Sequence, residues 1–320
     1  MAARRCYSPP KMKIVVTGAT GFIGSALVSA LHARGDEVVA LVRDAGSAQK
    51  KLSNVARAVT ADLENAGPWQ AELDGADAVI HLAGEPLAGH RWDARAKQRI
   101  RDSRVESTHL IANTIVMQSN ERRVRTLITA SGIDYYAFAD HTRAFDDDEI
   151  IERDPPGSSF LASVCRNWER ETDVARAAAV RTVQMRTAVV LGKDGGALPL
   201  LAKQFKFFLG GRLGSGRQWW SWIHLDDVVG AYLAAITDVR FVGPYNLVAP
   251  ETCRQRDFAS ALGHALHRPS FLPTPAFALR AAVGEFSDYL LNGRRAIPAA
   301  LQALRFAFAY PTLQTALQHV

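Results

Sequence analysis

Cysteine is scarce in this 320-residue chain, and long apolar runs are missing. The three cysteines, Cys6, Cys165 and Cys253, are odd in number and lack the spacing of metal ligands. They argue against a disulfide framework and for a reducing compartment, so we expect a cytoplasmic protein without a metal site. No apolar stretch approaches the length that spans a bilayer, so we expect no membrane partner.

A concentrated basic surface is also missing. The chain has 38 Lys and Arg against 32 Asp and Glu, a net charge of +6 and a pI near 9.4. No basic stripe is interleaved with aromatic residues, so we expect no nucleic-acid partner. This mild positive charge suits a small anionic ligand instead.

The first residues, MAARRCYSPPK, lack the apolar run of a secretory signal. We interpret residues 1–11 as a disordered leader. A true start at Met12 and a truncated targeting segment are the alternatives.

The segment from Lys13 to Gly24, KIVVTGATGFIG, combines a short apolar strand, three glycines and a helix start. Gly18, Gly21 and Gly24 let the backbone turn tightly and approach a pyrophosphate, which a side chain would prevent. The helix start adds free N–H groups and the positive end of a helix dipole. Strand, glycine turn and helix at this spacing predict a dinucleotide site, with a merely tight turn as the alternative.

The end of the next strand bears on which dinucleotide binds. Glu37–Val42 has the pattern of a buried strand, and Arg43 follows it, where an arginine suits a 2′-phosphate. The adjacent Asp44 would suit the free ribose hydroxyl of NAD, and strand ends are easily misplaced by one residue. We therefore expect NADP, with NAD less favoured and a solvated surface role as the alternative for Arg43. Asp62 is expected to accept from the adenine amino group, with Leu63 against the ring, or to cap a helix.

Strands and helices alternate over most of the chain. Further strands are expected at Val55–Thr60, Ala78–Ala83, Thr126–Ala130, Arg181–Leu191 and Tyr245–Val248, with helices notably at Ala94–Met117 and Ser158–Ala179. The alternation predicts an α/β fold, a doubly wound parallel sheet whose ligand lies at the carboxyl ends of the strands.

From Lys193 onward this alternation breaks into Gly-rich loops and helices. We expect a nucleotide domain of residues 12–192 plus 223–250 and a smaller, mostly helical lobe of residues 193–222 plus 251–320. A small-molecule substrate is expected in the cleft between them.

Several motifs occur in an order that resembles one family. They are TGATGFIG, HLAGEPLAGHRW (His81–Trp92), SGIDYY (Ser131–Tyr136), FLASVCRNWE (Phe160–Glu169), LGKDGGAL (Leu191–Leu198), GSGRQWWSWIHLDD (Gly214–Asp227) and RRAIPAALQALRFAFAYPTLQTAL (Arg294–Leu317). They are similar to the atypical extended short-chain dehydrogenases/reductases, in the YfcH-like epimerase family whose chains end in a DUF1731-type segment, here 272–320. The resemblance spans nearly the whole chain.

This resemblance implies a Rossmann-type domain, NAD(P) binding and a C-terminal substrate lobe. With the glycine turn it gives the expected cofactor contacts. They are Gly18, Thr20, Gly21, Phe22, Ile23, Gly24, Arg43, Asp62, Leu63, Leu82, Ala83, Gly84, Glu85 and Arg104.

The resemblance also implies that proton-handling groups are missing. Ordinary members use Ser, Tyr and Lys, with Tyr and Lys four residues apart on one helix face, so that the Lys charge lowers the Tyr pKa. In the matching helix Leu161 stands at the Tyr position and Cys165 at the Lys position. Arg104 replaces the usual Asn, and Ser131 alone is kept. The YfcH-like branch has this same pattern.

Other side chains are candidates for catalysis. Tyr135 and Tyr136 follow Ser131 at the same sheet edge, and either could handle a proton, or both pack as aromatics between the lobes. Cys165 beside Arg166 is a candidate nucleophile, or an inert apolar filler in mid-helix.

Arg217, Trp220 and His224 are the expected substrate contacts. Arg217 could bind a phosphate or carboxylate, or be solvated in its loop. His224 could act as an acid or base, or be a structural hydrogen-bonding group beside a helix start.

Two functions fit these features. One is an NADP-dependent oxidoreductase or epimerase with a non-standard proton relay. The other is a dinucleotide-binding sensor or structural partner without turnover. The sequence leaves a homodimer open.

Overall fold

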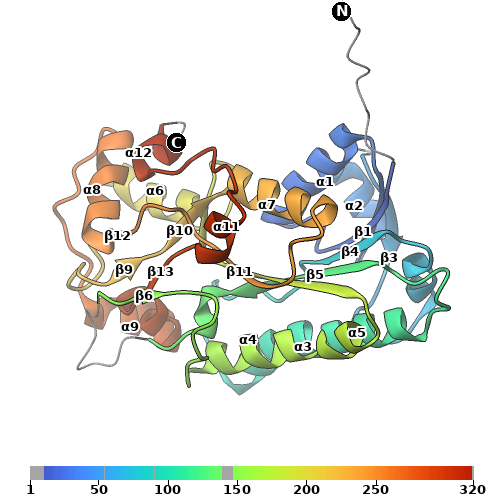
Figure 1. Cartoon of the computed structure of the whole chain (residues 1–320). Coiled ribbons are helices and arrows are strands. Elements are labelled where there is room, and N and C mark those ends of the chain that lie inside the picture. The colour runs from blue at the N-terminus through green and yellow to red at the C-terminus, as the bar shows by residue number, and fades with distance from the viewer. Residues whose placement is uncertain (1–10, 54, 90, 139–146, 319–320) are drawn as a thin grey trace, which may run out of the picture.

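The computed structural model describes residues 11–53, 55–89, 91–138 and 147–318 (Figure 1). Except for Lys11, the expected leader lies outside these residues. The centre is a seven-stranded sheet in which every pairing is parallel. Across the sheet the strands are β11 (Gly243–Leu247), β7 (Arg181–Thr187), β5 (Thr126–Gly132), β4 (Ala78–His81), β1 (Lys13–Thr17), β2 (Glu37–Val42) and β3 (Arg57–Thr60). The strand order reverses at β1, which confirms the doubly wound, Rossmann-type fold.

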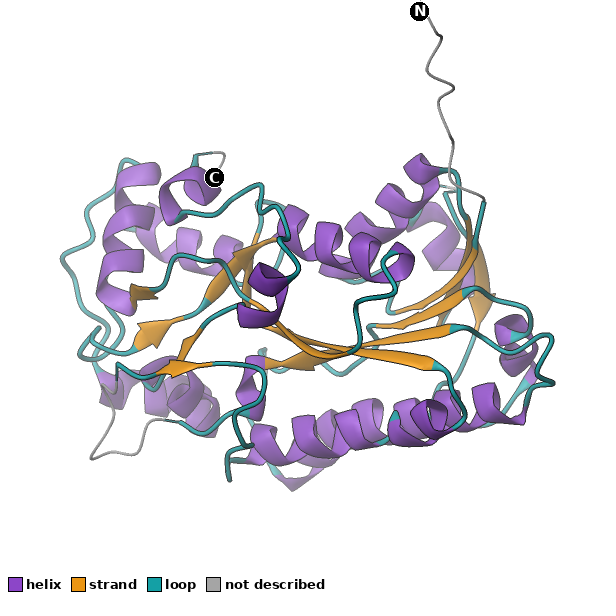
Figure 2. Cartoon of the chain, in the orientation of Figure 1, coloured by secondary structure: helices purple, strands orange, loops and turns teal. Residues whose placement is uncertain are grey.

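Alternate residues of each strand pack on opposite faces of the sheet. In β1, Ile14 and Val16 belong to one buried cluster and Val15 belongs to the other. Figure 2 shows helices above and below the sheet. The first face carries α1 (Phe22–Arg34), α2 (Ala45–Lys51), α7 (Leu225–Thr237) and α11 (Ala299–Ala303); the second carries η1 (Pro68–Leu73), α3 (Ala94–Met117), α4 (Phe160–Arg170) and α5 (Asp173–Ala177).

Two expected elements are each divided in the structure. The helix expected over Ser158–Ala179 breaks between α4 and α5, where the Thr172 hydroxyl donates to the Glu169 carbonyl at 2.7 Å and accepts from Gln184. Such a local hydrogen bond competes with helix continuation. The strand expected over Arg181–Leu191 leaves the sheet after β7 and continues as β8 (Val189–Leu191), which pairs with β10 (Trp222–His224).

The smaller lobe is built around a third apolar cluster, which includes Phe205, Trp222, Phe258 and Leu313. It lies at the opposite end of the molecule from β3 (Figure 1). Its further elements are α6 (Leu198–Lys206), β9 (Trp219–Trp220), β12 (Cys253–Arg254), α8 (Gln255–Ala265), α9 (Ala276–Val283), η3 (Gly284–Phe286), α10 (Ser287–Leu291), β13 (Arg295–Ala296) and α12 (Leu313–Leu317). Short strand β6 (Glu149–Ile150) pairs with β13, and η2 (Ile133–Tyr135) follows β5.

The segment from β13 to α12 also packs against the sheet domain. Leu301 of α11 is buried in the same cluster as α1 and α7. The Asp227 carboxylate at the start of α7 accepts from the backbone N–H groups of Ala309, at 2.6 Å, and Tyr310, at 3.0 Å. Glu152 accepts from the N–H of Ala300. Residues 299–310 therefore contribute to the core of both parts.

Candidate functional site

Two cavities meet at the carboxyl ends of the strands. We call the first the switch-point cavity; it measures about 760 Å³ and lies beside the glycine turn and the ends of β1 to β4. We call the second the inter-lobe cavity; it measures about 430 Å³ and is lined from both the sheet domain and the smaller lobe. Leu82, just after β4, lines both.

The glycine turn brings three backbone segments into contact. Gly18 has a φ of +66°, and a Cβ there would lie 2.7 Å from the Leu82 carbonyl carbon. A Cβ on Gly24 would lie 2.1 Å from the Gly18 oxygen, so α1 packs directly on the turn. Gly21 differs: its Cβ would meet only the Gly18 oxygen, at 3.1 Å, and Gly21 faces the cavity.

The start of α1 has the features of an anion site. No side chain caps it, and its first turn carries no acidic residue. The first-turn N–H groups of a helix have no partner within the helix and concentrate positive potential. The turn, with its open glycine and uncapped helix, therefore fits a pyrophosphate.

The end of β2 separates the roles of two adjacent charges. Arg43 lines the switch-point cavity, whereas Asp44 does not. Asp44 caps α2, and hydrogen bonds from Ser47 and Gly46 lower the pKa of its carboxyl. Lys51 at the end of α2 lines the cavity with Arg43 and donates to the Thr20 carbonyl at 2.6 Å. Sequence reasoning missed Lys51, because its place follows from how α2 packs.

Most of the other expected cofactor residues also line this cavity. Asp62 accepts from the N–H of Glu64 and from Asn65, and Glu85 forms an ion pair with Arg99 at 3.5 Å. The expected residues that line the switch-point cavity are Gly18, Thr20, Gly21, Arg43, Asp62, Leu63, Leu82, Ala83, Gly84 and Glu85.

Four expected cofactor residues lie elsewhere. Ile23 and Arg104 line the inter-lobe cavity, and Phe22 and Gly24 line neither cavity. The Phe22 ring packs against the loop after β8, where a Cβ on Gly195 would lie 2.5 Å from it.

A buried polar chain supports the turn from behind. The Thr17 hydroxyl lies 2.7 Å from His81 Nδ1 and accepts from the N–H groups of Leu82 and Ala83. His81 Nε2 lies 2.9 Å from the Ser107 hydroxyl. Burial, aided by the positive charge of Arg104, lowers the pKa of His81 to about 3, so the imidazole is neutral. These hydrogen bonds fix the positions of β4 and α3 relative to the glycine turn.

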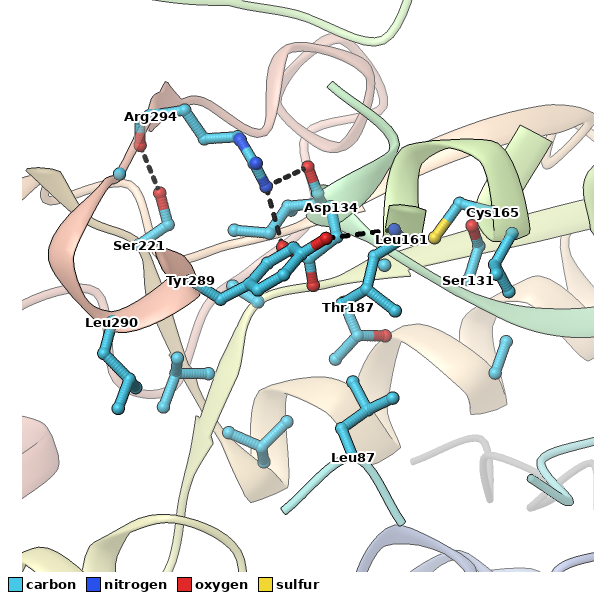
Figure 3. Close-up of a pocket in the computed structure, with 18 of the residues that line it drawn as sticks. Leu87, Ser131, Asp134, Leu161, Cys165, Thr187, Ser221, Tyr289, Leu290 and Arg294 are labelled. Carbon is cyan, nitrogen blue, oxygen red and sulfur yellow. Dashed lines mark hydrogen bonds and ion pairs between the residues drawn. The ribbon is translucent and has the colours of Figure 1, made fainter. Parts of the chain in front are cut away.

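The inter-lobe cavity brings together residues far apart in the sequence (Figure 3). Ser131, Leu161 and Cys165 lie on the sheet-domain side, and Tyr289 and Arg294 come from the C-terminal segment. Leu161 and Cys165 therefore share one face of α4, as their spacing predicts. Burial, with the negative charges of Asp134 and Glu169, raises the pKa of the Cys165 thiol to about 12. A thiol that stays protonated is a poor nucleophile at neutral pH.

Ser131 begins a buried hydrogen-bond network that the sequence did not reveal. Its hydroxyl donates to Glu169 Oε1 at 2.7 Å. Arg186 donates to the same carboxylate from Nε and Nη2, at 2.8 and 2.7 Å, and to the Tyr136 hydroxyl at 2.8 Å. Tyr136 in turn donates to Asn246 at 2.7 Å. The available signal was Arg186 inside a strand expected to be central in the sheet, since a buried charge requires a partner.

The two tyrosines after Ser131 belong to this network and line neither cavity. The Tyr135 ring lies 3.5 Å from the Arg186 guanidinium carbon. Tyr136 is buried, which raises its pKa to about 12 despite the nearby Arg186 charge. The alternative that both are packed aromatics agrees with this arrangement.

The expected substrate residues are separated in the structure. Trp220 lines the inter-lobe cavity, whereas Arg217 and His224 line neither cavity. His224 caps α7, accepting from the Asp226 N–H at 3.1 Å, and its ring lies 3.7 Å from the Tyr310 ring.

Arg294, which sequence reasoning missed, lines the inter-lobe cavity and bonds Asp134 at 2.9 Å and the Ile133 carbonyl at 2.7 Å. Within the described ranges, no helix has both the length and the apolar character to cross a bilayer. The same residues include no cluster of three His, Cys, Asp or Glu side chains suited to a metal.

Comparisons with known proteins agree with this geometry. Residues 14–248 match the model of the NAD dependent epimerase/dehydratase family, and residues 274–320 match a domain of unknown function, DUF1731. The chain is 37% identical over 312 residues to "Epimerase family protein SDR39U1 homolog, chloroplastic" of Arabidopsis thaliana, covering 97% of this chain and 87% of the relative. It is 38% identical over 315 residues to "Epimerase family protein ML0860" of Mycobacterium leprae, covering 97% and 95%.

Solved structures give the same picture. The human epimerase family protein SDR39U1, solved with NADPH, superposes with a TM-score of 0.83 at 31% identity over 97% of this chain and 99% of that one. UDP-glucuronic acid 4-epimerase of Bacillus cereus, solved with NAD, shares the fold with a TM-score of 0.73 at 19% identity, covering 96% of each chain. The chain thus belongs to the NAD-dependent epimerase/dehydratase family, as a member that ends in a DUF1731 segment.

Proposed function

We propose that this chain is an NADP(H)-dependent oxidoreductase or epimerase with a non-standard proton relay. The observation that carries the cofactor preference is the end of β2, where Arg43 and Lys51 line the cavity and Asp44 is engaged as a helix cap. Two cations suit a 2′-phosphate, whereas selection of NAD needs a carboxylate facing the ribose. The human relative solved with NADPH supports this choice.

Each part of the switch-point cavity has a role in this proposal. Gly21 and the N–H groups at the start of α1 hold the pyrophosphate, and Asp62 with Leu63 positions the adenine. The dinucleotide, when bound, supplies or accepts a hydride. The chain's own residues must orient the substrate, exclude water and move the proton.

Ser131 and Glu169 form the proposed proton relay. The Ser131 hydroxyl lines the inter-lobe cavity and already donates to the Glu169 carboxylate. A substrate hydroxyl that loses its proton to Ser131 Oγ would drive the Ser131 proton onto Glu169 Oε1, and the reverse step would return it. Leu161 and Cys165 close the wall on this side; a leucine moves no proton, and a thiol with a pKa of about 12 does not replace an ammonium.

A second candidate function has its own support. Glu169 is already shared with Arg186, and Tyr136 is held by two hydrogen bonds inside the network. Because these groups are already held by hydrogen bonds to one another, the arrangement suits a dinucleotide-binding sensor or structural partner that performs no turnover.

The other parts of the proposal follow from the same reasoning. They are a division into a nucleotide domain and a substrate lobe, a small-molecule substrate in the inter-lobe cavity, no nucleic-acid or membrane partner, and a cytoplasmic location. A homodimer is compatible with this proposal.

Stopped-flow oxidation of bound NADPH by a panel of carbonyl compounds and quinones tests the proposal. We expect turnover with at least one acceptor, and Ser131→Ala should lower it about 10²- to 10⁴-fold while leaving NADPH affinity unchanged. Ser163→Ala, on α4 but outside the cavity wall, is the matched control. Tight NADPH binding without oxidation across the panel would favour the sensor, and absence of NADPH binding would overturn both functions.

A further inference from the structure

The unpartnered buried side-chain atoms of the residues that line the inter-lobe cavity are all donors in the described part of the chain. Among its lining side chains, Arg294 Nη2, Trp168 Nε1 and Trp220 Nε1 are buried N–H groups without a partner. The buried oxygen atoms without a partner, in Thr129, Thr182, Gln218 and Tyr232, all belong to residues outside this wall. Residues of the described wall therefore hold three unpartnered buried N–H groups, beside the hydroxyls of Ser131, Thr187 and Ser221, which can donate or accept. These unpartnered donors favour a ligand that brings acceptor atoms.

The charge of the wall is also one-sided. Its charged residues are Arg104, Arg294 and Asp134, and Asp134 is already bonded to Arg294. Arg104 donates to the carbonyls of Ile100 and Glu85, and it has no carboxylate within ion-pair distance in the described part of the chain. Burial lowers the pKa of Arg104, and the negative charges of Glu85, outside this wall, and of Asp134 oppose that shift. The wall thus has one positive charge in excess.

The rest of the wall is apolar and largely aromatic. Phe138, Leu161, Trp168, Phe286 and Tyr289 contribute to it. Leu161 and Tyr289 lie next to each other in Figure 3, where the Tyr289 hydroxyl accepts from the Leu161 N–H at 3.0 Å. A sugar ring places a hydroxyl donor at nearly every carbon, and each donor buried here without an acceptor would cost about 1–3 kcal/mol. A flat unsaturated ligand loses nothing against such walls and gains aromatic contact.

We propose that the inter-lobe cavity binds a monoanionic, flat and largely apolar ligand, an aromatic or conjugated carboxylate, rather than a nucleotide-linked sugar. The carboxylate lies toward Arg104 and Arg294, and the apolar body lies against Leu161 and the aromatic side chains of η3 and α10. This inference deepens the proposed function, because it names the substrate class of the same cavity and rests on that function for the cavity's role in turnover.

Binding to the full chain tests the ligand class without any turnover. The probes are cinnamate, benzoate and 2-naphthoate, each with its neutral methyl ester, and UDP-glucose. Trp168 and Trp220 in the wall make intrinsic fluorescence a direct readout, and thermal stability is a second one. We expect saturable quenching by at least one carboxylate, with its ester at least about tenfold weaker and no displacement by UDP-glucose.

Variants on α3 localise the charge that is recognised. Arg104→Gln should weaken the carboxylate at least about tenfold and leave the ester unchanged, whereas Arg104→Lys should keep most of the affinity. Arg101→Gln removes the same charge from an exposed position of the helix and is the matched control. Since the comparison of acid and ester needs no variant, a misfolded Arg104→Gln protein would not stop the test.

The outcomes separate this inference from the proposed function. Esters equal to their acids, tighter binding of UDP-glucose, or no carboxylate binding at millimolar concentration would each overturn the inference. NADPH titrated into the same samples reports on the proposed function independently. Carboxylate binding without NADPH binding would overturn the proposed function but would still support the proposed ligand class.

Discussion

Arg186 on β7 holds Glu169 on α4 in a two-pronged ion pair, with Nε to Oε1 at 2.8 Å and Nη2 to Oε2 at 2.7 Å. Their side chains are 4% and 13% exposed, so water screens the pair little. The pair joins Ser131, in the cavity wall, to Tyr136 and Asn246 behind it. Positioning of Ser131 and stability of the sheet domain are therefore coupled.

Removal of one partner of this pair should be costly. Glu169→Gln leaves the Arg186 charge buried without a counter-charge, which we expect to lower the free energy of unfolding by about 3–5 kcal/mol. Urea denaturation measures this loss. Glu169→Gln combined with Arg186→Met should recover part of it, because the double variant leaves no buried charge. An unchanged midpoint in the single variant would contradict the buried pair.

The glycine turn gives a sharp test of the phosphate site. Gly21→Asp puts a carboxylate into the switch-point cavity, where a Cβ meets only the Gly18 oxygen, so the fold should survive and NADPH binding should be abolished. Ser29→Asp, exposed on the same helix, adds the same charge away from the cavity and should bind NADPH normally. Calorimetric titration measures both, and an intact NADPH isotherm in Gly21→Asp would refute the assignment.

Arg43 should discriminate between the two dinucleotides. Arg43→Asp removes a charge-assisted contact with the 2′-phosphate, so NADPH affinity should fall about 10- to 100-fold while NADH changes little. Lys50→Asp makes the same charge change on α2 without touching the cavity wall and controls for long-range effects. Equal losses for NADPH and NADH would mean that Arg43 does not contact the phosphate.

His81 should make the fold sensitive to acid. Its folded-state pKa of about 3 lies below the ordinary 6.5, so the unfolded chain binds the proton more readily. The contribution of this pKa difference to the free energy of unfolding is complete above pH 6.5. It is lost as pH falls toward 3, at up to about 1.4 kcal/mol per pH unit. Urea midpoints should therefore fall as the pH is lowered from about 7 to about 4.5, and they should fall less steeply in His81→Gln. His32→Gln, exposed on α1, is the matched control; an equal slope in His81→Gln would contradict a buried neutral imidazole.

The sequence predicted the local features of the fold well. Lys13 to Gly24 determines its own strand, turn and helix, because the apolar strand, the glycines and the helical pattern are adjacent in the chain. The alternation of strands and helices, with the resemblance, led to the correct parallel sheet. The sequence favoured Arg43 over Asp44 but left Asp44 as an alternative, since what separates them is that Asp44 turns back to cap α2.

The inter-lobe cavity was much less predictable. Arg294 lies 160 positions from Asp134 in the chain, and the two meet only because β13 pairs with β6 beside the end of β5. Neither propensity nor spacing reports such a meeting. The role of Glu169 was hidden for a similar reason, as its partners come from two neighbouring strands.

The packing of residues 299–310 against the sheet has a consequence for biosynthesis. A nascent chain cannot complete the burial of the apolar cluster around α1 and α7 until Leu301 has left the ribosome, and Asp227 and Glu152 obtain hydrogen-bond partners from the same segment. We expect the amino-terminal domain to remain incompletely closed through most of translation. A premature stop before Ala299 should then yield a target for proteolysis and not a working nucleotide-binding fragment.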